Sequence, residues 1–149
     1  MASLRERLAM PGQLFHVGFC VSDLDKSLPF YVDTLGFKLN NRWEETNAQT
    51  DPGMGVPGCS LELAQLEGYG IVLELFVFKD GAGNPIPPAP NQVGCAHLSI
   101  GVGDMNAFVA KLKEEGKVEF VSDPMRLTVG QWVFIKDPDG ILVEIMGLL

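Results

Sequence analysis

The chain has 149 residues, of which 46% are hydrophobic and 20% are charged, a balance typical of a folded domain rather than a disordered chain. Its formal net charge of −8 argues against nucleic acid or an anionic membrane surface as a partner, because both would repel an acidic protein. No stretch approaches the roughly 18 consecutive apolar residues of a membrane-spanning helix, so we expect no membrane insertion.

Residues 1–12 are predicted to form an N-terminal extension ahead of a domain that spans 13–149. This extension is charged and has no apolar core segment, so we expect no secretory signal. The three cysteines, Cys20, Cys59 and Cys95, are odd in number and follow no spacing pattern, which fits small buried residues in a reducing compartment. A cytoplasmic protein is therefore expected.

The first predicted strand, 15–21, reads FHVGFCV, and its apolar residues alternate with the others. The alternation places His16 on the less apolar face. A helix is predicted over 24–35, with Pro29 near its first turns, and Gly36 is its expected stop. A second strand is predicted over 37–43.

The rest of the first half is predicted to contain two more strands. LELAQLE at 61–67 and GIVLELF at 70–76 are rich in strand-forming residues, and the second of them has Glu74 in its middle. Between the second and third strands, the glycine-rich segment 50–60 is expected to be a loop. It lacks the Gly-Lys-Ser/Thr ending of a phosphate-binding loop.

The second half repeats this plan. A strand over 96–102 carries His97 on its less apolar face, and a helix over 105–115 has Asp104 as its expected N-cap and Gly116 as its stop. Three strands follow, predicted over 118–121, from Trp132 to an Asp-Gly turn, and over 140–146, where Glu144 occupies the middle.

Each half thus reads strand, helix, strand, strand, strand. We predict two βαβββ modules, about 14–79 and 95–147, joined by the Pro- and Gly-rich loop 80–94. The chain's two histidines occupy matching positions of the repeat, and so do the two mid-strand glutamates.

A glutamate between aliphatic strand residues is costly to bury unless it is paired, protonated or bound to a cation. If the halves pack about a pseudo-two-fold axis, His16, Glu74, His97 and Glu144 can converge and give a divalent ion two imidazole and two carboxylate ligands. A set without thiolates suits Ni, Co, Mn, Fe, Zn or Mg. A single strand histidine or glutamate is usually a core or surface residue, but the matching of all four favours a metal site.

Three segments resemble the vicinal oxygen chelate superfamily, which includes glyoxalase I, methylmalonyl-CoA epimerase, bleomycin resistance proteins and extradiol dioxygenases. They are HVGFCVSDLDKSLPFYVDTLGFKL, AHLSIGVGDMNAFVAKLKEEG and VFIKDPDGILVEIM. The resemblance implies an α+β, glyoxalase-like fold in which tandem βαβββ modules form a curved mixed sheet around a metal-binding cleft. It also implies metal ligands on the first and fourth strands of each module, which are again His16, Glu74, His97 and Glu144.

The resemblance further implies a divalent-metal-dependent isomerase or lyase of the glyoxalase I/epimerase type. In such an enzyme the metal stabilises an enolate-like intermediate of a small carbonyl or thioester substrate, with Glu144 or Glu74 as the catalytic base. Epimerases of the family usually have glutamine where Glu74 stands, and no arginines match those expected for glutathione; the chain offers chiefly Arg42 and Arg126. A homodimer and a small-molecule substrate are implied.

Two alternatives stay open at this point. One is another metalloenzyme of the superfamily, such as an iron-dependent dioxygenase or an antibiotic-resistance enzyme. The other is a metal-free small-molecule binding protein, which would leave the four matched residues unexplained. Strand alternation predicts an apolar surround for the site, with Phe76 and Phe78 on the face of Glu74 and Met146 on the face of Glu144.

Overall fold

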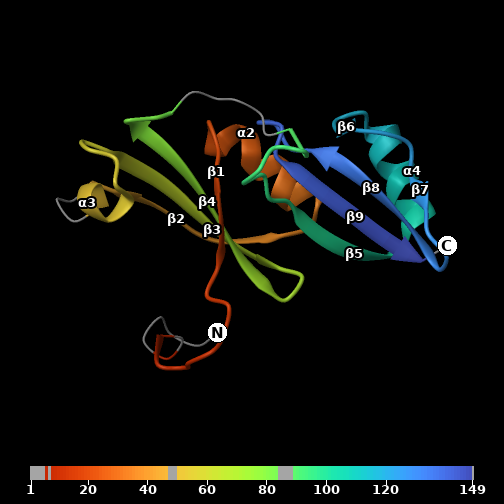
Figure 1. Cartoon of the computed structure of the whole chain (residues 1–149), viewed down its shortest axis with the longest axis horizontal. Helices are drawn as coiled ribbons and strands as arrows, with labels where there is room; N and C mark the ends of the chain where they lie inside the picture. Colours follow the sequence, from red (N-terminus) through yellow and green to blue (C-terminus); the bar gives the residue numbers. More distant parts are fainter. Residues whose placement is uncertain (1–5, 7, 47–49, 84–88, 149) are drawn as a thin grey trace. The chain divides into compact units, whose positions relative to one another are not determined.

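The structure, a computed structural model, describes residues 6, 8–46, 50–83 and 89–148. It contains two mixed sheets and few helices (Figure 1), which confirms the predicted α+β class. The chain divides into two compact units. The first unit comprises Met1–Leu24 and Gly36–Ala82, and the second comprises Asp25–Leu35 and Gly83–Leu149.

The first unit is built on a four-stranded sheet in the order β1-β4-β3-β2. Strand β1 runs parallel to β4, whereas the β2–β3 and β3–β4 pairs are antiparallel. The strands are β1 (Val17–Cys20), β2 (Lys38–Glu45), β3 (Ser60–Gly68) and β4 (Ile71–Asp80).

One face of this sheet carries the apolar core of the first unit. Ala64 and Leu66 on β3 and Leu73 and Leu75 on β4 are completely buried, and strand alternation puts them on the face opposite Glu74. Burying each leucine contributes about 2 kcal/mol. This face therefore fixes the register that directs Glu74 to the other side.

The second unit contains a sheet of the same design, in the order β5-β9-β8-β6, with β7 paired to β8. Strand β5 is parallel to β9, and β8 is antiparallel to β9, as in the first sheet. Its elements are β5 (Leu98–Asp104), α4 (Met105–Glu115), β6 (Glu119–Phe120), β7 (Met125–Arg126), β8 (Gly130–Lys136) and β9 (Leu142–Leu148).

Helix α4 lies along this sheet (Figure 1) and contacts β5 and β9. Its ends are those predicted from the sequence. The Asp104 carboxylate accepts the Ala107 N–H at 2.9 Å, which satisfies a free donor of the first turn. Gly116 adopts a left-handed φ of 63° and donates its N–H to the Leu112 carbonyl at 3.2 Å.

The helix predicted over 24–35 changes from an α-helix to a π-helix at Pro29. It begins as α2 (Leu24–Pro29) and continues as a π-helical turn, η1 (Phe30–Thr34). Pro29 has no N–H to donate to the preceding turn, and beyond it the Leu35 N–H bonds to the Phe30 carbonyl at 3.0 Å, in the i to i+5 pattern of a π-helix.

Several smaller features differ from the expectations. A short helix, α3 (Thr50–Met54), occupies part of the segment expected to be a loop, and β7 was not predicted. Cys59 is buried, as the sequence suggested, but Cys20 is exposed on the Glu74 side of β1. Among the described residues, no helix is both long and apolar enough to span a membrane.

Candidate metal centre

The first candidate pair is His16, which immediately precedes β1, and Glu74 on β4, the strand that runs parallel to β1. Glu74 on β4 lies opposite Gly18 on β1, and His16 precedes Gly18 by two residues, so its side chain falls on the same face. The His16 Nε2 and Glu74 Oε1 atoms are 3.8 Å apart. The histidine side chain is 37% exposed and the glutamate side chain 16% exposed.

The second pair, His97 and Glu144, repeats this relationship in the second sheet. Glu144 on β9 lies opposite Ser99 on β5, and His97 precedes Ser99 by two residues. The His97 Nε2 and Glu144 Oε2 atoms are 3.7 Å apart, with side-chain exposures of 43% and 18%. The sequence repeat is thus a repeat of side-chain geometry as well.

Neither pair is a hydrogen bond, because separations of 3.7–3.8 Å exceed hydrogen-bonding length. Among the described residues, neither the Glu74 nor the Glu144 carboxylate accepts a hydrogen bond. Each half-buried carboxylate therefore keeps its lone pairs available, next to an imidazole nitrogen that can also act as a ligand. This donor set fits a divalent cation.

The structure brings the four predicted ligands together as two pairs, one in each compact unit. Across the part of the chain that the structure describes, no group of three or more His, Cys, Asp or Glu side chains is arranged to hold a metal ion. Each pair supplies one nitrogen and one oxygen donor, a combination that suits borderline or hard ions rather than soft ones. A site made of all four remains a prediction.

Aromatic side chains flank the first pair, as predicted. Strand register places Phe76 and Phe78 on the Glu74 face. Their rings meet edge to face, with the ring centroids 5.9 Å apart. Gly18 leaves room for this arrangement, because a Cβ atom there would lie 3.2 Å from the Phe76 ring. On the neighbouring strand, Gln65 is directly opposite Glu74.

The second pair has an apolar surround of its own. Phe134 on β8 lies directly opposite Glu144. Its ring meets the His97 ring edge to face, with the ring centroids 5.0 Å apart. The Trp132 and Phe134 rings meet edge to face with their centroids 5.4 Å apart, and Trp132 lies opposite Met146, which is on the Glu144 face as predicted.

Gln65 and Phe134 were missed in reading the sequence, although a signal for both was present. Counting residues outwards from the turn between β3 and β4 pairs Gln65 with Glu74, and counting from the Asp-Gly turn pairs Phe134 with Glu144. The strands themselves were predicted from the sequence, but the residue pairs that face each other across the two turns were not.

A pocket of about 490 Å³ lies elsewhere in the second unit. It is lined by residues of α2 and η1, by residues from the end of α4 to β6, and by Lys136, Asp137 and Pro138, and it contains none of the four predicted ligands. Its charged lining is mixed in sign. It is therefore a separate feature from the candidate metal centre.

The two mixed sheets of the same strand order are those of a glyoxalase-like fold. The chain belongs to the Glyoxalase/Bleomycin resistance protein/Dioxygenase superfamily, whose sequence profile matches residues 13–145. This confirms the resemblance to the vicinal oxygen chelate superfamily that the sequence motifs carried.

Similar proteins agree with this membership. The chain is 33% identical to the uncharacterized protein YaeR of Escherichia coli over 89% of this chain and 94% of that protein. It is 29% identical to a probable lactoylglutathione lyase of Vibrio parahaemolyticus, over 91% of this chain and 90% of the relative. The crystal structure of a glyoxalase family protein from Bacillus cereus shares the fold, with a TM-score of 0.79, 20% identity, and coverage of 95% of this chain and 99% of that one.

Proposed function

We propose that the protein is a divalent-metal-dependent isomerase or lyase of the glyoxalase I/epimerase type, acting on a small carbonyl or thioester substrate. The observation that carries this proposal is the repeated pair of side chains: His16 with Glu74, and His97 with Glu144, in the same register on equivalent strands. Membership of the superfamily and similarity to a probable lactoylglutathione lyase support it. As in the family, we propose a homodimer.

The four residues would hold the ion through two imidazole nitrogens and two carboxylates, and the donor set suits Ni, Co, Mn, Fe, Zn or Mg. When bound, the ion would supply Lewis-acid chemistry by supporting negative charge that develops on a substrate oxygen. The histidines are neutral ligands, so the charge of the ion would be balanced by Glu74 and Glu144.

One of these glutamates would also move a proton. Its carboxylate would take the proton from the carbon next to the carbonyl, and the C–H electron pair would move into the carbonyl to give an enolate. Return of the proton to the same carbon from the other face would give an epimer. Return to the neighbouring carbon would give an isomer.

Metal content is the first test of this function. Protein purified without chelators should contain bound divalent metal by elemental analysis, and less than about 0.2 ion per chain after incubation with Ni²⁺, Co²⁺ or Zn²⁺ would contradict a metal-dependent enzyme. Oxygen consumption that depends on ferrous iron would instead indicate a dioxygenase.

Proton transfer is the second test. The metal-loaded protein should exchange the α-proton of a suitable substrate for deuterium from D₂O, which NMR can follow on a panel of hydroxycarbonyl compounds, hemithioacetals and thioesters. The absence of exchange across the whole panel would count against an enolate mechanism. Glu144→Gln and Glu74→Gln are the variants in which exchange should be lost.

A further inference from the structure

The distribution of cations around the first His–Glu pair indicates which charges a substrate can carry. The sequence has 11 Lys and Arg residues, of which Arg5 and Arg7 lie outside the described residues. Across the four strands of the first sheet, register places one cation on the Glu74 face. That cation is Lys38, on the edge strand β2 and directly opposite Glu67. The face thus carries more carboxylates than cations.

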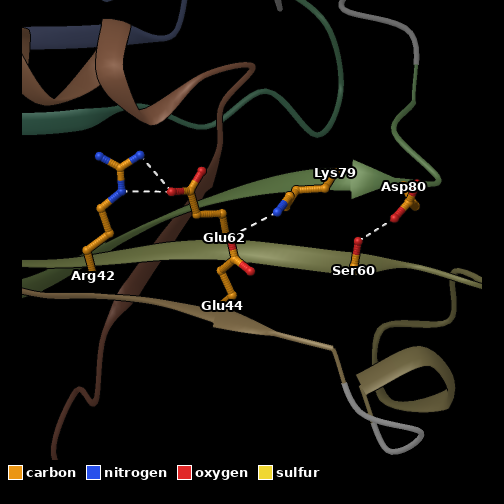
Figure 2. A network of polar contacts seen from close by, with 6 residues as sticks. All are labelled: Arg42, Glu44, Ser60, Glu62, Lys79 and Asp80. Atoms are coloured by element: carbon orange, nitrogen blue, oxygen red, sulfur yellow. Dashed lines mark hydrogen bonds and ion pairs between the residues drawn. The ribbon is translucent and has the colours of Figure 1, made fainter.

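The other two cations of this sheet point away from the pair. Arg42 and Lys79 project from the opposite face, where Figure 2 shows them bound to carboxylates. The Arg42 guanidinium is 2.6 Å from Glu62, and the Lys79 ammonium is 2.9 Å from Glu44. Neither is placed to receive an anion on the Glu74 face.

The second sheet repeats this pattern. Register places one cation of its strands, Lys136, on the Glu144 face, and its ammonium is 2.6 Å from the Glu119 carboxylate. Arg126 pairs with Gln131, whose side chain is on the opposite face. On the described strands, each site face therefore carries one cation and more carboxylates than cations, and Lys136 is already paired with Glu119.

Aromatic side chains line both site faces. Phe76 and Phe78 extend along the Glu74 face, and Phe134 and Trp132 extend along the Glu144 face. All four side chains are only partly buried, so a ligand can cover them further. Multiply charged groups are normally held by Arg and Lys, and a partly desolvated carboxylate without such a partner is costly.

We infer that the substrate of this site carries its metal-directed oxygens on an uncharged aryl or alkyl group, and that conjugates bearing additional carboxylates or phosphates are disfavoured. This inference rests on the proposed metal-dependent function. It narrows the substrate class from any small carbonyl or thioester compound to neutral, apolar ones.

Three hydroxamates test it, because each presents two adjacent oxygens to a metal and they differ only in the group attached. Acetohydroxamate measures chelation alone, benzohydroxamate adds a neutral ring, and 4-carboxybenzohydroxamate adds a carboxylate to that ring. Binding to the Co²⁺-loaded protein would be followed by calorimetry and by the visible absorption of the metal. Each affinity would be divided by that for free Co²⁺ in the same buffer.

The neutral ring should improve binding about tenfold over acetohydroxamate, from apolar surface covered on the ring and the aromatic side chains. The added carboxylate should weaken binding about tenfold relative to benzohydroxamate, because the described strands place more carboxylates than cations on each site face. Failure of acetohydroxamate to bind the loaded protein would overturn the proposed function, and the inference with it. Chelation without a preference for the neutral ring would overturn the inference alone.

A charge substitution sharpens the test. Met146→Lys places a cation on the Glu144 face, whereas Val129→Lys makes the same charge change in a loop where the native side chain is 74% exposed. Met146→Lys should recover most of the affinity for 4-carboxybenzohydroxamate, and Val129→Lys should leave the order of the three ligands unchanged. Equal recovery in both variants would show that net charge, and not the site face, sets the preference, which would overturn the inference.

Discussion

Tyr31 donates its phenolic hydroxyl to Asp137 across 106 positions of sequence, with the two oxygens 2.9 Å apart in the buried interior of the second unit. The second Asp137 oxygen accepts the backbone N–H groups of Asp139 at 2.9 Å and Ile141 at 2.7 Å. One carboxylate thus joins the π-helical turn to the turn between β8 and β9. Because β9 carries Glu144, this bond lies in the same structural unit as the second half of the candidate metal centre.

Removing the hydroxyl should measure the strength of this connection. Tyr31→Phe keeps the ring of a side chain with no exposed surface but leaves a buried carboxylate oxygen without its donor, so the free energy of unfolding should fall by about 1–3 kcal/mol. Urea denaturation would measure the change. Ser60→Ala is the matched control, because it removes a hydroxyl that donates to Asp80 on the surface, and it should cost less than about 1 kcal/mol. Equal losses would refute a special contribution from the buried bond.

The same carboxylate should make stability depend on pH. Burial raises the pKa of Asp137 above its ordinary value of 3.8, and hydrogen bonds from Ile141, Tyr31 and Asp139 oppose the rise without cancelling it. Burial also raises the pKa of Tyr31, so the phenol remains the donor. The folded state therefore binds the Asp137 proton more tightly than the unfolded state. This contribution to stability is fully present below pH 3.8 and is lost as the pH rises through the raised pKa.

Asp137→Asn isolates this effect, because asparagine can accept the same backbone N–H groups but does not titrate in this range. As the pH rises from about 4 to 7, the native protein should lose stability relative to Asp137→Asn. Urea titrations at each pH would show this. Asp123→Asn, at a side chain that is 89% exposed, controls for the loss of one negative charge. Parallel stability profiles for the native protein and Asp137→Asn would contradict the prediction.

Most of the fold could be predicted from two sequence patterns, the strand alternation and the internal repeat. Positions 15–21 and 96–102 alternate clearly because one face of each sheet is buried, so Leu98 and Ile100 face inward while Ser99 and Gly101 do not. The same alternation put Phe76 and Met146 on the correct faces. The repeat put the two histidines and the two glutamates at matching positions, and equivalent strands do occupy equivalent places in both sheets.

Other features depend on contacts that no local pattern encodes. The sequence assigned the helix over 24–35 to the first module, but residues 25–35 form part of the second compact unit, where Tyr31 meets Asp137. A π-helical turn after Pro29 is also invisible to a pattern of apolar spacing, because the same residues stay buried. The two-residue strand β7 has too few residues to show alternation.

Glycines on the second sheet offer a contrast in packing. A Cβ atom at Gly130 would lie 2.5 Å from the Gly147 carbonyl oxygen, so Gly130→Ala would force apart the backbones of β8 and β9. A Cβ atom at Gly101 would meet nothing within 4 Å. Gly130→Ala should therefore reduce the free energy of unfolding by about 1–3 kcal/mol through overpacking, whereas Gly101→Ala should be neutral or slightly stabilising. Thermal unfolding monitored by circular dichroism would compare the two, and a Gly130→Ala protein as stable as Gly101→Ala would disprove the close approach.

The equivalence of the two His–Glu pairs leads to the most direct prediction about the candidate centre. If one ion uses both pairs, His16→Ala and His97→Ala should weaken metal binding by similar factors. Each factor should be at least about 10–100-fold, which is the loss of metal affinity that follows removal of an outer-sphere partner. Glu144→Gln or Glu74→Gln should retain some metal and lose turnover, because an amide oxygen is a weaker ligand and no base.

Glu62→Gln provides the matched control for these variants, because Glu62 is a strand carboxylate on the opposite face of the first sheet, bound to Arg42. It should leave metal affinity, measured by competition with a chromogenic chelator, unchanged. A large loss in only one histidine variant would place the metal in a single unit and would contradict a site made of four ligands. Similar losses in both, with Glu62→Gln unaffected, are the result expected if all four residues hold one ion.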